Sequence, residues 1–465
     1  MRRSAMAHSF AKVPHIAIPR SSFNRGHRVM TTFDADYLVP VLVDEVVPGD
    51  TFNVNMHFFV RTATPEFPIM DNMYLESFSF FVPYRIVWDN WKKMHGEQVN
   101  PADSIDFTTP IVNSGNAVGE GDLSDYMGLP IGLNTTGDNI SVLPFRAYRA
   151  IWNYWFRDQN LQNSETVVTD DGPDSNSECG FANPPLKRCK KRDYFTSCLP
   201  WPQKGDAVTL PLGTSAPVAT TITAGTQLRI NRQSAVGTTV AQSVLDSNLA
   251  TVDLGVDSAG SAMYTDLTNA IAPTLNDLRL AVQTSRLLER DARAGTRYKE
   301  MILGHFGVTV PDFRVQEPEY LGGGSTRINI TPVAQTSGQP TPAAGDKLGN
   351  LAAIGTASGS HGFTKSFVEY GIVMTLVNVR SDITYSQGVE RFWTKQTRYD
   401  YFYPVLAFIG EQAVLNQEIF HQDVAGTGAG QDQGVFGYQE RYGEYRYKPS
   451  RLTGLFAVDA ASSLS

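Results

Sequence analysis

The sequence predicts an all-β fold, an antiparallel sandwich of the jelly-roll kind whose long loops carry a few helices. Its 39 glycines, 26 prolines and 11% aromatic residues are typical of a chain rich in strands and turns. Stretches in which apolar and polar residues alternate lie far apart in the sequence, as expected when strands are joined by long insertions. The length, 465 residues, fits two to three domains or one all-β domain enlarged by insertions.

Three segments are predicted to be strands of this sandwich. Residues 51–61 alternate apolar and polar side chains, which indicates a strand with one face buried. Residues 73–82 repeat the alternation, and Pro83 stops it. Residues 366–379 are largely apolar, which indicates a strand covered on both faces. The Tyr-rich stretch 436–447 is also strand-like.

Two helices are predicted in the loops. Pro144 suits the first turn of a helix that carries Phe145, Tyr148, Trp152, Trp155 and Phe156 on one face. The second helix begins near Thr274, a good N-cap, and ends near Gly295. Its apolar stripe is made by Leu275, Leu278, Val282 and Leu288. Its basic face is made by Arg279, Arg286, Arg290 and Arg293.

Two segments differ in composition from the rest. Residues 204–272 are rich in small and β-branched residues, with Tyr264 as their one aromatic residue, and predict an inserted subdomain of short strands. Residues 334–362 are rich in Ala, Gly, Thr, Ser and Pro and predict a long loop. The chain is therefore divided into an N-terminal arm and entry segment, a first part of the core, an insertion, and the rest of the core with the C-terminal segment, at 1–50, 51–203, 204–272 and 273–465.

The first 33 residues form a basic arm on a chain whose net charge is −8. No acid precedes Asp34, so any contact with a polyanion would come from local patches of this kind. The arm is either a solvated tail or a segment that contacts nucleic acid or a neighbouring subunit. Its basic residues are Arg2, Arg3, Lys12, Arg20, Arg25 and Arg28.

A second basic cluster precedes the aromatic residues Tyr194, Phe195 and Trp201. Cationic side chains can follow phosphates while aromatic faces accept stacked bases, a combination suited to flexible single strands. A solvated or inter-subunit basic patch is the alternative interpretation. The cluster consists of Lys187, Arg188, Lys190, Lys191 and Arg192.

Two glycine-rich motifs do not carry catalytic patterns. The run GGGST at 322–326 has neither the spacing nor the lysine of a phosphate-binding loop and predicts a tight turn. The run GSHG at 359–362 sets Ser360 beside His361 but does not match the nucleophile elbow of hydrolases, so it predicts a loop. We expect no catalytic constellation, no cofactor and no enzymatic activity.

The metal-ligating residue types give one weak candidate site. Cys179, Cys189 and Cys198 fit neither a zinc pattern nor a disulfide framework, which favours free thiols in a reducing compartment. Four carboxylates in a turn-rich loop suit Ca²⁺ by their chemistry, although an ordinary acidic loop is the alternative because the EF-hand spacing is absent. These carboxylates are Asp170, Asp171, Asp174 and Glu178.

The sequence has no apolar run of about 18 residues and no signal-peptide core. We therefore expect no membrane insertion and synthesis in a cytoplasm.

Motifs along most of the chain resemble the major capsid proteins of gokushoviruses, small single-stranded DNA bacteriophages of the Microviridae. The resemblance spans roughly residues 8–456 and leaves mainly 204–272 unmatched. The similar runs are 8–23, FDADYLVP at 33–40 with DEVVPGD at 44–50, FFVP at 80–83 with Trp88, YFTS at 194–197 with LPWPQKG at 199–205, LERDAR at 288–293 with GTRY at 295–298, GSHGF at 359–363, and YQERY at 438–442 with EYRYKPS at 444–450.

The resemblance implies an eight-stranded jelly roll of the viral capsid type and a T=1 icosahedral shell around a circular single-stranded DNA genome. It implies pentamers and three-fold contacts between copies, an internal scaffolding protein, a minor capsid or pilot protein, and a host surface receptor. The protein would be part of the virion, assembled in the bacterial cytoplasm. The family usually continues well past the run 451–456, so the resemblance also implies that the usual C-terminal segment is missing or replaced.

In this family the variable insertion projects at the three-fold axes, which assigns that place to residues 204–272. About 70 residues so poor in large side chains bury too little apolar area alone, and symmetry copies would supply the rest. We expect an exposed trimeric protrusion used in host attachment, with a floppy surface insertion as the alternative. Its packing residues would be Val218, Leu228, Val236, Val240, Val244, Leu245 and Leu249.

Two other functions remain open from the residues alone. A carbohydrate-binding jelly-roll module, such as the receptor-binding protein of a phage, would share the fold class. A cupin-type metalloenzyme is less well supported because clustered histidines are absent. Formation of uniform shells distinguishes the capsid interpretation from both.

Overall fold

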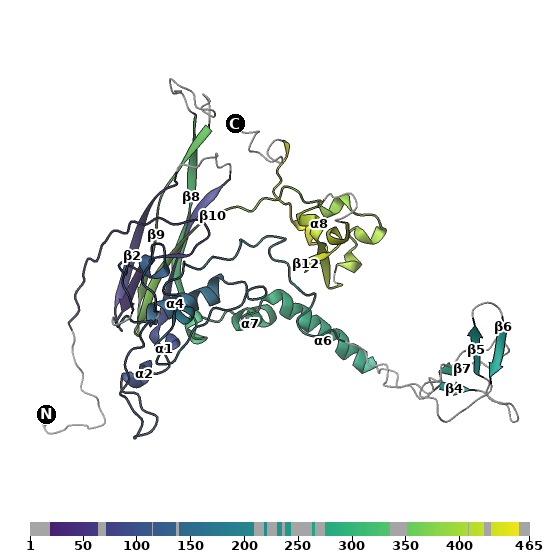
Figure 1. Ribbon diagram of the computed structural model, residues 1–465, viewed down its shortest axis with the longest axis horizontal. Coiled ribbons are helices and arrows are strands. Elements are labelled where there is room, and N and C mark those ends of the chain that lie inside the picture. Colours follow the sequence, from purple (N-terminus) through teal and green to yellow (C-terminus); the bar gives the residue numbers. More distant parts are fainter. Residues whose placement is uncertain are drawn as a thin grey trace, which may run out of the picture.

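Six strands form one curled antiparallel sheet in the order β1-β10-β3-β8-β9-β2 (Figure 1). The computed structural model describes residues 19–63, 71–113, 115–135, 139–208, 218–220, 230–234, 238–242, 263–265, 275–334, 351–407, 409–422 and 429–454. The strands are β1 (Val39–Val46), β2 (Thr51–Arg61), β3 (Met73–Pro83), β8 (Glu319–Ala334), β9 (Leu351–Ser366) and β10 (Gly371–Ser381). The expected antiparallel β-architecture is confirmed to this extent, with six strands described in the main sheet rather than eight.

The sheet curls at β8, which pairs with two different strands along its length. Its residues 319–328 pair with β3, and its residues 329–334 pair with β9. The curl lays β9 and β2 over β1, β10 and β3. A core fills the space between the two layers, where Val46, Phe81 and Val373 meet Phe363 and Phe367.

Glycines let the two layers approach closely at β8 and β9. A Cβ on Gly324 would lie 2.5 Å from the His361 ring, and one on Gly322 would lie 3.3 Å from the carbonyl oxygen of Gly362. The runs 322–326 and 359–362 are therefore strand residues, and the predictions of a tight turn and a loop were wrong. The two glycine runs were interpreted as a turn and a loop, but here the glycines allow close contact between strands that are distant in the sequence.

Helices cover the other face of β1, β10 and β3. They are α1 (Tyr84–Val87), α2 (Trp91–Met94), α3 (Leu123–Tyr126), α4 (Leu143–Ile151), the π-helix η1 (Trp152–Phe156) and α5 (Asn176–Cys179). Pro144 lies in the first turn of α4, as predicted. The aromatic face of α4 and η1 packs on Phe80, Ile372 and Met374 of the sheet. β10 is buried throughout 371–379 because it has the sandwich core on one face and these helices on the other.

The strand boundaries follow the predictions for β2 and β3 and differ for β10. β2 alternates exposed and half-buried residues along its length, as expected of a strand at the edge of the sheet. The predicted strand 366–379 begins five residues before β10 does. Phe367 bonds instead to the turn at Gly49 and Asp50, because the chain crosses between layers there. β9 also begins at Leu351, inside the segment predicted to be a loop.

Outside the insertion, the remaining described elements are α6 (Leu275–Ala294), α7 (Tyr298–Phe306), η2 (Asp312–Arg314) and a C-terminal unit, residues 391–446, which is drawn in yellow-green in Figure 1. α6 ends at Gly295 with a positive φ of 114°, as predicted, whereas Thr274 lies outside the described residues. The unit contains η3 (Arg391–Trp393), η4 (Arg398–Asp400), η5 (Pro404–Leu406), β11 (Glu411–Leu415), α8 (Asn416–Ile419), α9 (Ala429–Asp432), β12 (Val435–Glu440) and η6 (Gly443–Arg446). The strand-like stretch 436–447 is thus part strand and part 3-10 helix.

Four short strands are described within the insertion. β4 (Val218–Thr220) pairs with β7 (Met263–Thr265), and β5 (Ile230–Ser234) pairs with β6 (Thr238–Gln242). Short strands were expected here. Of the proposed packing residues, Val218 is in β4 and Val240 is in β6. The others lie outside the described residues, namely Leu228, Val236, Val244, Leu245 and Leu249.

Candidate nucleic-acid interface

The described part of the arm, 19–33, is an exposed segment without regular secondary structure, held to the body at a few points. Arg20 donates to the carbonyl oxygen of Gly49, and Arg25 forms an ion pair with Asp44 at 2.7 Å. Phe23, by contrast, is 82% exposed. Arg28 is exposed and has no ion pair with any described residue. Arg28 is thus available to a ligand, whereas Arg20 and Arg25 fasten the arm.

The three basic residues predicted nearer the N-terminus, Arg2, Arg3 and Lys12, lie outside the described residues.

Arg188 belongs to a half-buried ion-pair network inside the subunit. Its guanidinium contacts the Glu76 carboxylate, which Arg380 also approaches at 3.0 Å. The same guanidinium lies 4.6 Å from the centroid of the Phe78 ring. Burial raises the pKa of Glu76, but the two arginines outweigh it and hold that pKa below its ordinary value. Arg188 therefore stabilises the fold, which makes it a poor candidate for DNA contact.

Lys187 and Lys191 are partly engaged within the subunit. Lys187 lies over the Tyr37 ring at 5.1 Å, and its carbonyl oxygen accepts from the Trp152 indole. Lys191 donates to Asp382 at 2.9 Å. Both residues remain exposed, so their charges still contribute to the surface potential.

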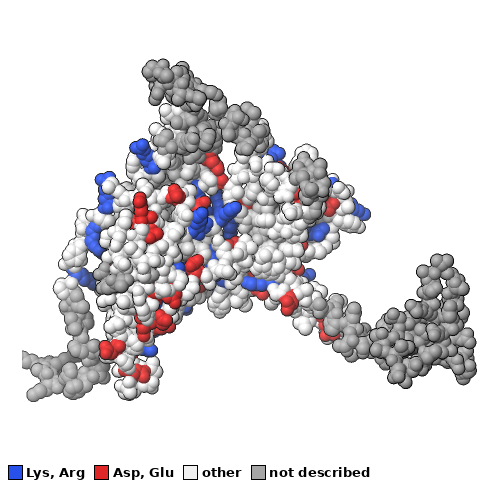
Figure 2. Space-filling view, in the orientation of Figure 1, with Lys and Arg blue, Asp and Glu red and all other residues white. Residues whose placement is uncertain are grey.

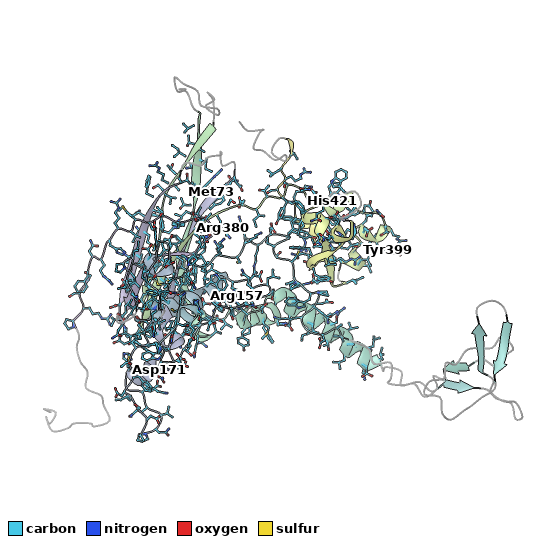
Figure 3. All side chains as sticks on the ribbon, viewed as in Figure 1. Met73, Arg157, Asp171, Arg380, Tyr399 and His421 are labelled. Carbon is cyan, nitrogen blue, oxygen red and sulfur yellow. The ribbon has the colours of Figure 1, made fainter. Side chains whose placement is uncertain are left out.

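Lys190 and Arg192 are the exposed members of the cluster for which the described residues offer no ion pair. The Arg192 side chain lines a hollow of about 330 Å³ with Arg446 and Tyr447. Figure 2 shows Lys and Arg side chains gathered between the sheet body and the C-terminal unit. In Figure 3, Arg380 lies on the side of the sheet that faces this unit, which carries Tyr399 and His421. These positions make a cationic surface that can accept phosphates.

Two of the three aromatic residues near this cluster, Phe195 and Tyr194, are not free platforms for bases. Phe195 is only 5% exposed and packs edge-on against Tyr385. One face of Tyr194 is already stacked on Tyr447, with the ring planes 16° apart. The idea that Phe195 stacks on bases was therefore wrong, because it is a core residue. The prediction that remains for this cluster is electrostatic contact between its cationic side chains and phosphates.

Sequence reasoning missed the part of this surface that comes from the C-terminal unit. Gln439 donates to the carbonyl oxygen of Tyr194 at 2.8 Å, and Leu199 pairs with Tyr438 as an isolated bridge. These contacts bring Arg446 and Tyr447 beside Arg192. Both segments belong to runs singled out in the sequence, but their spacing of about 240 residues gave no sign that they meet.

The four carboxylates of the weak Ca²⁺ candidate each have a separate structural role. Asp174 is buried against Arg146, and Asp171 accepts from the Trp88 indole at 2.8 Å. Glu178 closes a capping box at the start of α5. Asp170, whose side chain is 72% exposed, accepts from the backbone N–H of Gly172. In the described ranges no three His, Cys, Asp or Glu residues are grouped so that they could hold a metal ion.

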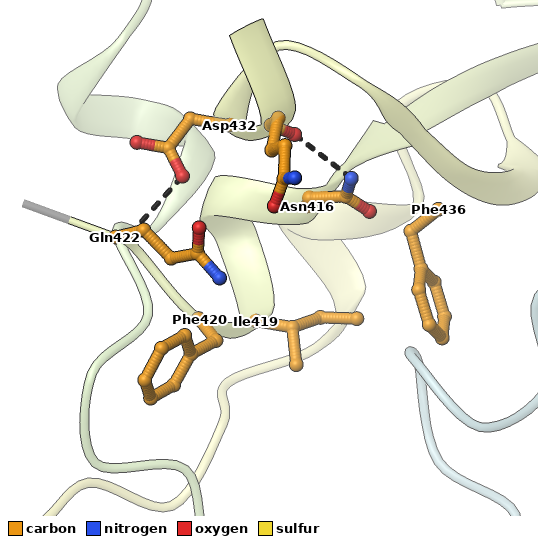
Figure 4. Close-up of a pocket in the computed structure, with 7 residues that line it drawn as sticks. Asn416, Ile419, Phe420, Gln422, Asp432 and Phe436 are labelled. Carbon is orange, nitrogen blue, oxygen red and sulfur yellow. Dashed lines mark hydrogen bonds between the residues drawn. The ribbon is translucent and has the colours of Figure 1, made fainter. Parts of the chain in front are cut away.

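A second, smaller pocket lies within the C-terminal unit (Figure 4). Its volume is about 210 Å³, and its walls include Phe420 and Phe436. The Asp432 carboxylate accepts from the backbone N–H of Gln422 at 3.1 Å and lies 2.9 Å from His421. Asn416 donates to the carbonyl oxygen of Gln431. The polar groups in this pocket are thus used to fold the unit.

Among the described helices, none combines the length and apolar character needed to cross a bilayer.

The chain matches known proteins over nearly its whole length. A family model described as "Capsid protein (F protein)" matches residues 11–465. The capsid protein VP1 of Bdellovibrio phage phiMH2K is 43% identical, over 98% of this chain and 86% of its own. The VP1 proteins of Chlamydia phage 1 and Spiroplasma virus 4 are 37% and 35% identical, each over 99% of this chain and 88% and 86% of their own. These relatives favour a shell subunit over a carbohydrate-binding module.

Proposed function

This chain belongs to the phage capsid protein (F protein) family, and we propose that its copies form a T=1 icosahedral shell around a circular single-stranded DNA genome. Its relatives are the major capsid proteins of gokushoviruses, so the protein is a structural component of the virion and not an enzyme. Membership also implies self-assembly into a capsid. The finer points, which are shell geometry, DNA contact and host attachment, form the proposal.

The observation that supports DNA contact is the exposed charge of Lys190 and Arg192, neither of which has an ion pair with a described residue. Arg192 also shares a hollow with Arg446, whose guanidinium pairs with Glu440. Cations that already have partners gain little from a phosphate, because they must first give up those partners. Unpaired exposed cations bind phosphates with a salt-sensitive affinity that does not depend on sequence. The arm, through Arg28 and the basic residues before it, supplies further charge of the same kind.

The test compares three sets of variants in a phage assembly system. Lys190→Gln with Arg192→Gln should lower the amount of DNA per particle and flatten its dependence on salt by about two charges. Arm variants Arg2→Gln, Arg3→Gln and Arg28→Gln should add to this loss. The matched control is Arg61→Gln with Arg314→Gln, which removes two exposed arginines from β2 and η2.

The outcomes separate the parts of the proposal. Filled particles at normal yield from the Lys190 and Arg192 variant would remove these two residues from the DNA interface. The same DNA loss in the control would mean that total charge matters and the position does not. Absence of closed shells from the unaltered chain with its assembly partners would overturn the shell itself.

We also propose that residues 204–272 form a surface protrusion at the three-fold axis that attaches the virion to a host receptor. The support is the composition of the segment and the strands β4 to β7, which pair with one another and not with the main sheet. Assembly in the bacterial cytoplasm, with an internal scaffolding protein and a minor capsid or pilot protein, completes the proposal.

A further inference from the structure

Helix α6 exposes most of its surface in the part of the chain that the structure describes. Of its 20 residues only Ala292 is buried, and the first six, 275–280, are all exposed. Near its other end, Arg293 pairs with Glu411 and Asp291 bonds to His305 of α7 at 2.7 Å. Figure 1 shows the N-terminal part of α6 extending away from the sheet body. A long exposed helix of this kind is stabilised when something covers its apolar side chains.

The exposed surface of α6 combines apolar and cationic side chains. Leu275, Leu278 and Val282 are 63%, 42% and 43% exposed and share one stripe. At 3.6 residues per turn, Arg279, Arg286 and Arg290 fall within about 40° of one another, beside that stripe. All three are exposed, and none has an ion pair with a described residue. We call these three arginines the arginine ridge.

The same chain carries a surface of opposite charge. Between Lys93 and Arg146 the sequence contains seven Asp or Glu residues and no Lys or Arg. Asp106 and Glu120 are exposed, Glu97 is exposed and lies 3.9 Å from Lys92, and we call the exposed residues of this stretch the acidic face. Figure 2 shows Asp and Glu gathered over this end of the body, around α1 and α2.

The acidic face also exposes large apolar side chains. Val99 is 86% exposed and Ile131 is 63% exposed, and the loops carrying Glu120 and Ile131 are joined by backbone hydrogen bonds between Val118 and residues 132–133. The acidic face is therefore complementary to the exposed surface of α6. Its negative charges can pair with the arginine ridge, and its apolar groups can cover Leu275, Leu278 and Val282.

We propose that the exposed face of α6 docks on the acidic face of a neighbouring copy of this chain. The proposal rests on assembly of the chain into a shell. Because the two surfaces are different parts of one chain, the contact can repeat head-to-tail, and it forms a ring when the rotation between copies closes around a symmetry axis. DNA phosphates would satisfy the arginine ridge but would leave Leu275, Leu278 and Val282 uncovered, so a second copy accounts for more of the surface.

A charge exchange tests the pairing. In the ridge variant, Arg279→Glu and Arg286→Glu place like charges against the acidic face, and in the face variant, Asp106→Lys and Glu120→Lys do the same from the other side. Because like charges set against each other disfavour the contact, we expect shell yield to fall about tenfold or more in each. The four-fold variant that carries both sets should recover shell yield to within about two-fold of the unaltered chain, since opposite charges meet again.

A matched control separates local pairing from net charge. The ridge variant combined with Asp34→Lys, Thr31→Lys and Thr32→Lys, all at exposed positions, has the same net charge as the four-fold variant but leaves the acidic face unchanged. It should remain defective, and recovery equal to that of the four-fold variant would overturn the proposal. Thermal unfolding of each unassembled variant checks folding, and the recovered four-fold variant carries the same α6 substitutions.

Two further outcomes distinguish a failure of the proposed contact from a failure of the proposed function. Shells that form normally from the ridge variant but retain less DNA would assign the arginine ridge to nucleic acid and overturn the contact between copies. If the unaltered chain forms no shells under the same conditions, the proposed function fails first, which is a different result.

Discussion

Arg146 of α4 donates to both carboxylate oxygens of Asp174, from Nε at 2.8 Å and from Nη2 at 2.5 Å, with the two side chains 0% and 1% exposed. The Nη1 group of the same guanidinium donates to the carbonyl oxygens of Val87 and Asp170. One buried cation thereby joins α1, α4 and the acidic loop that looked like a cation site in the sequence.

Replacing Asp174 by Asn should destabilise the subunit strongly. The substitution leaves the buried Arg146 charge with the exposed carboxylate of Asp170, 3.4 Å from Nη2, as its anionic partner, which costs about 3–5 kcal/mol of unfolding free energy. Urea denaturation of the purified chain measures this cost. Asp170→Asn changes an exposed carboxylate in the same loop and should cost less than about 1 kcal/mol. Added Ca²⁺ should not shift the urea midpoint of the unaltered chain, and a clear upward shift would restore the cation-site hypothesis.

His361 should make the stability of the sandwich depend on pH. Its Nδ1 lies 2.6 Å from the Ser77 hydroxyl and its Nε2 lies 2.9 Å from the Thr326 hydroxyl, and burial lowers its pKa. In the unfolded chain a histidine titrates near about 6.5. As pH falls below that value, the unfolded state binds the proton first, so the unfolding free energy falls until the folded pKa is reached.

The difference between the unaltered chain and His361→Gln isolates this effect from other titrating groups. The pH-dependence between 6.5 and the folded pKa should be weaker in the variant. His57→Gln, on the outer face of β2, is the matched control. Identical pH profiles for the unaltered chain and His361→Gln would contradict the role assigned to His361.

The insertion should be removable without loss of the shell. The backbone N–H of Lys204 lies 3.4 Å from the carbonyl oxygen of Leu288, and the chain re-enters at Leu275, 13 residues back along α6. At 1.5 Å per residue these points are roughly 20 Å apart, a span that about 12 Gly/Ser residues match. Replacing 206–271 by such a linker should permit shells and abolish adsorption to the host. Normal adsorption would refute the attachment role.

The elements predicted best from sequence are those whose signal is local. β2 and β3 each show the alternation of a strand with one buried face, and α4 and α6 are bounded by Pro144 and Gly295, whose effects on the backbone are intrinsic. β8 and the first part of β9 were missed because their glycines and small residues serve a close approach between layers. That approach is a property of the folded chain.

The candidate interface likewise combines features that are local in the sequence with features that depend on the folded chain. The basic residues were visible in the sequence, but which of them are free depends on distant partners. Glu76 and Arg380 occupy Arg188, and Asp382 engages Lys191. From composition alone, Arg188 and Lys191 appear as available for phosphate contact as Lys190 and Arg192. In the fold, the first two already have acidic partners.

The strand order also determines when each strand can first pair during synthesis of the chain. β1 pairs with β10, β2 with β9 and β3 with β8 and β10, so none of the first three strands has a partner until the ribosome has passed residue 319. At elongation rates of about 5–20 residues per second, those strands wait on the order of tens of seconds with their edges open. The nascent chain must be kept from pairing with other chains during that interval, and every residue added to the insertion at 204–272 lengthens it.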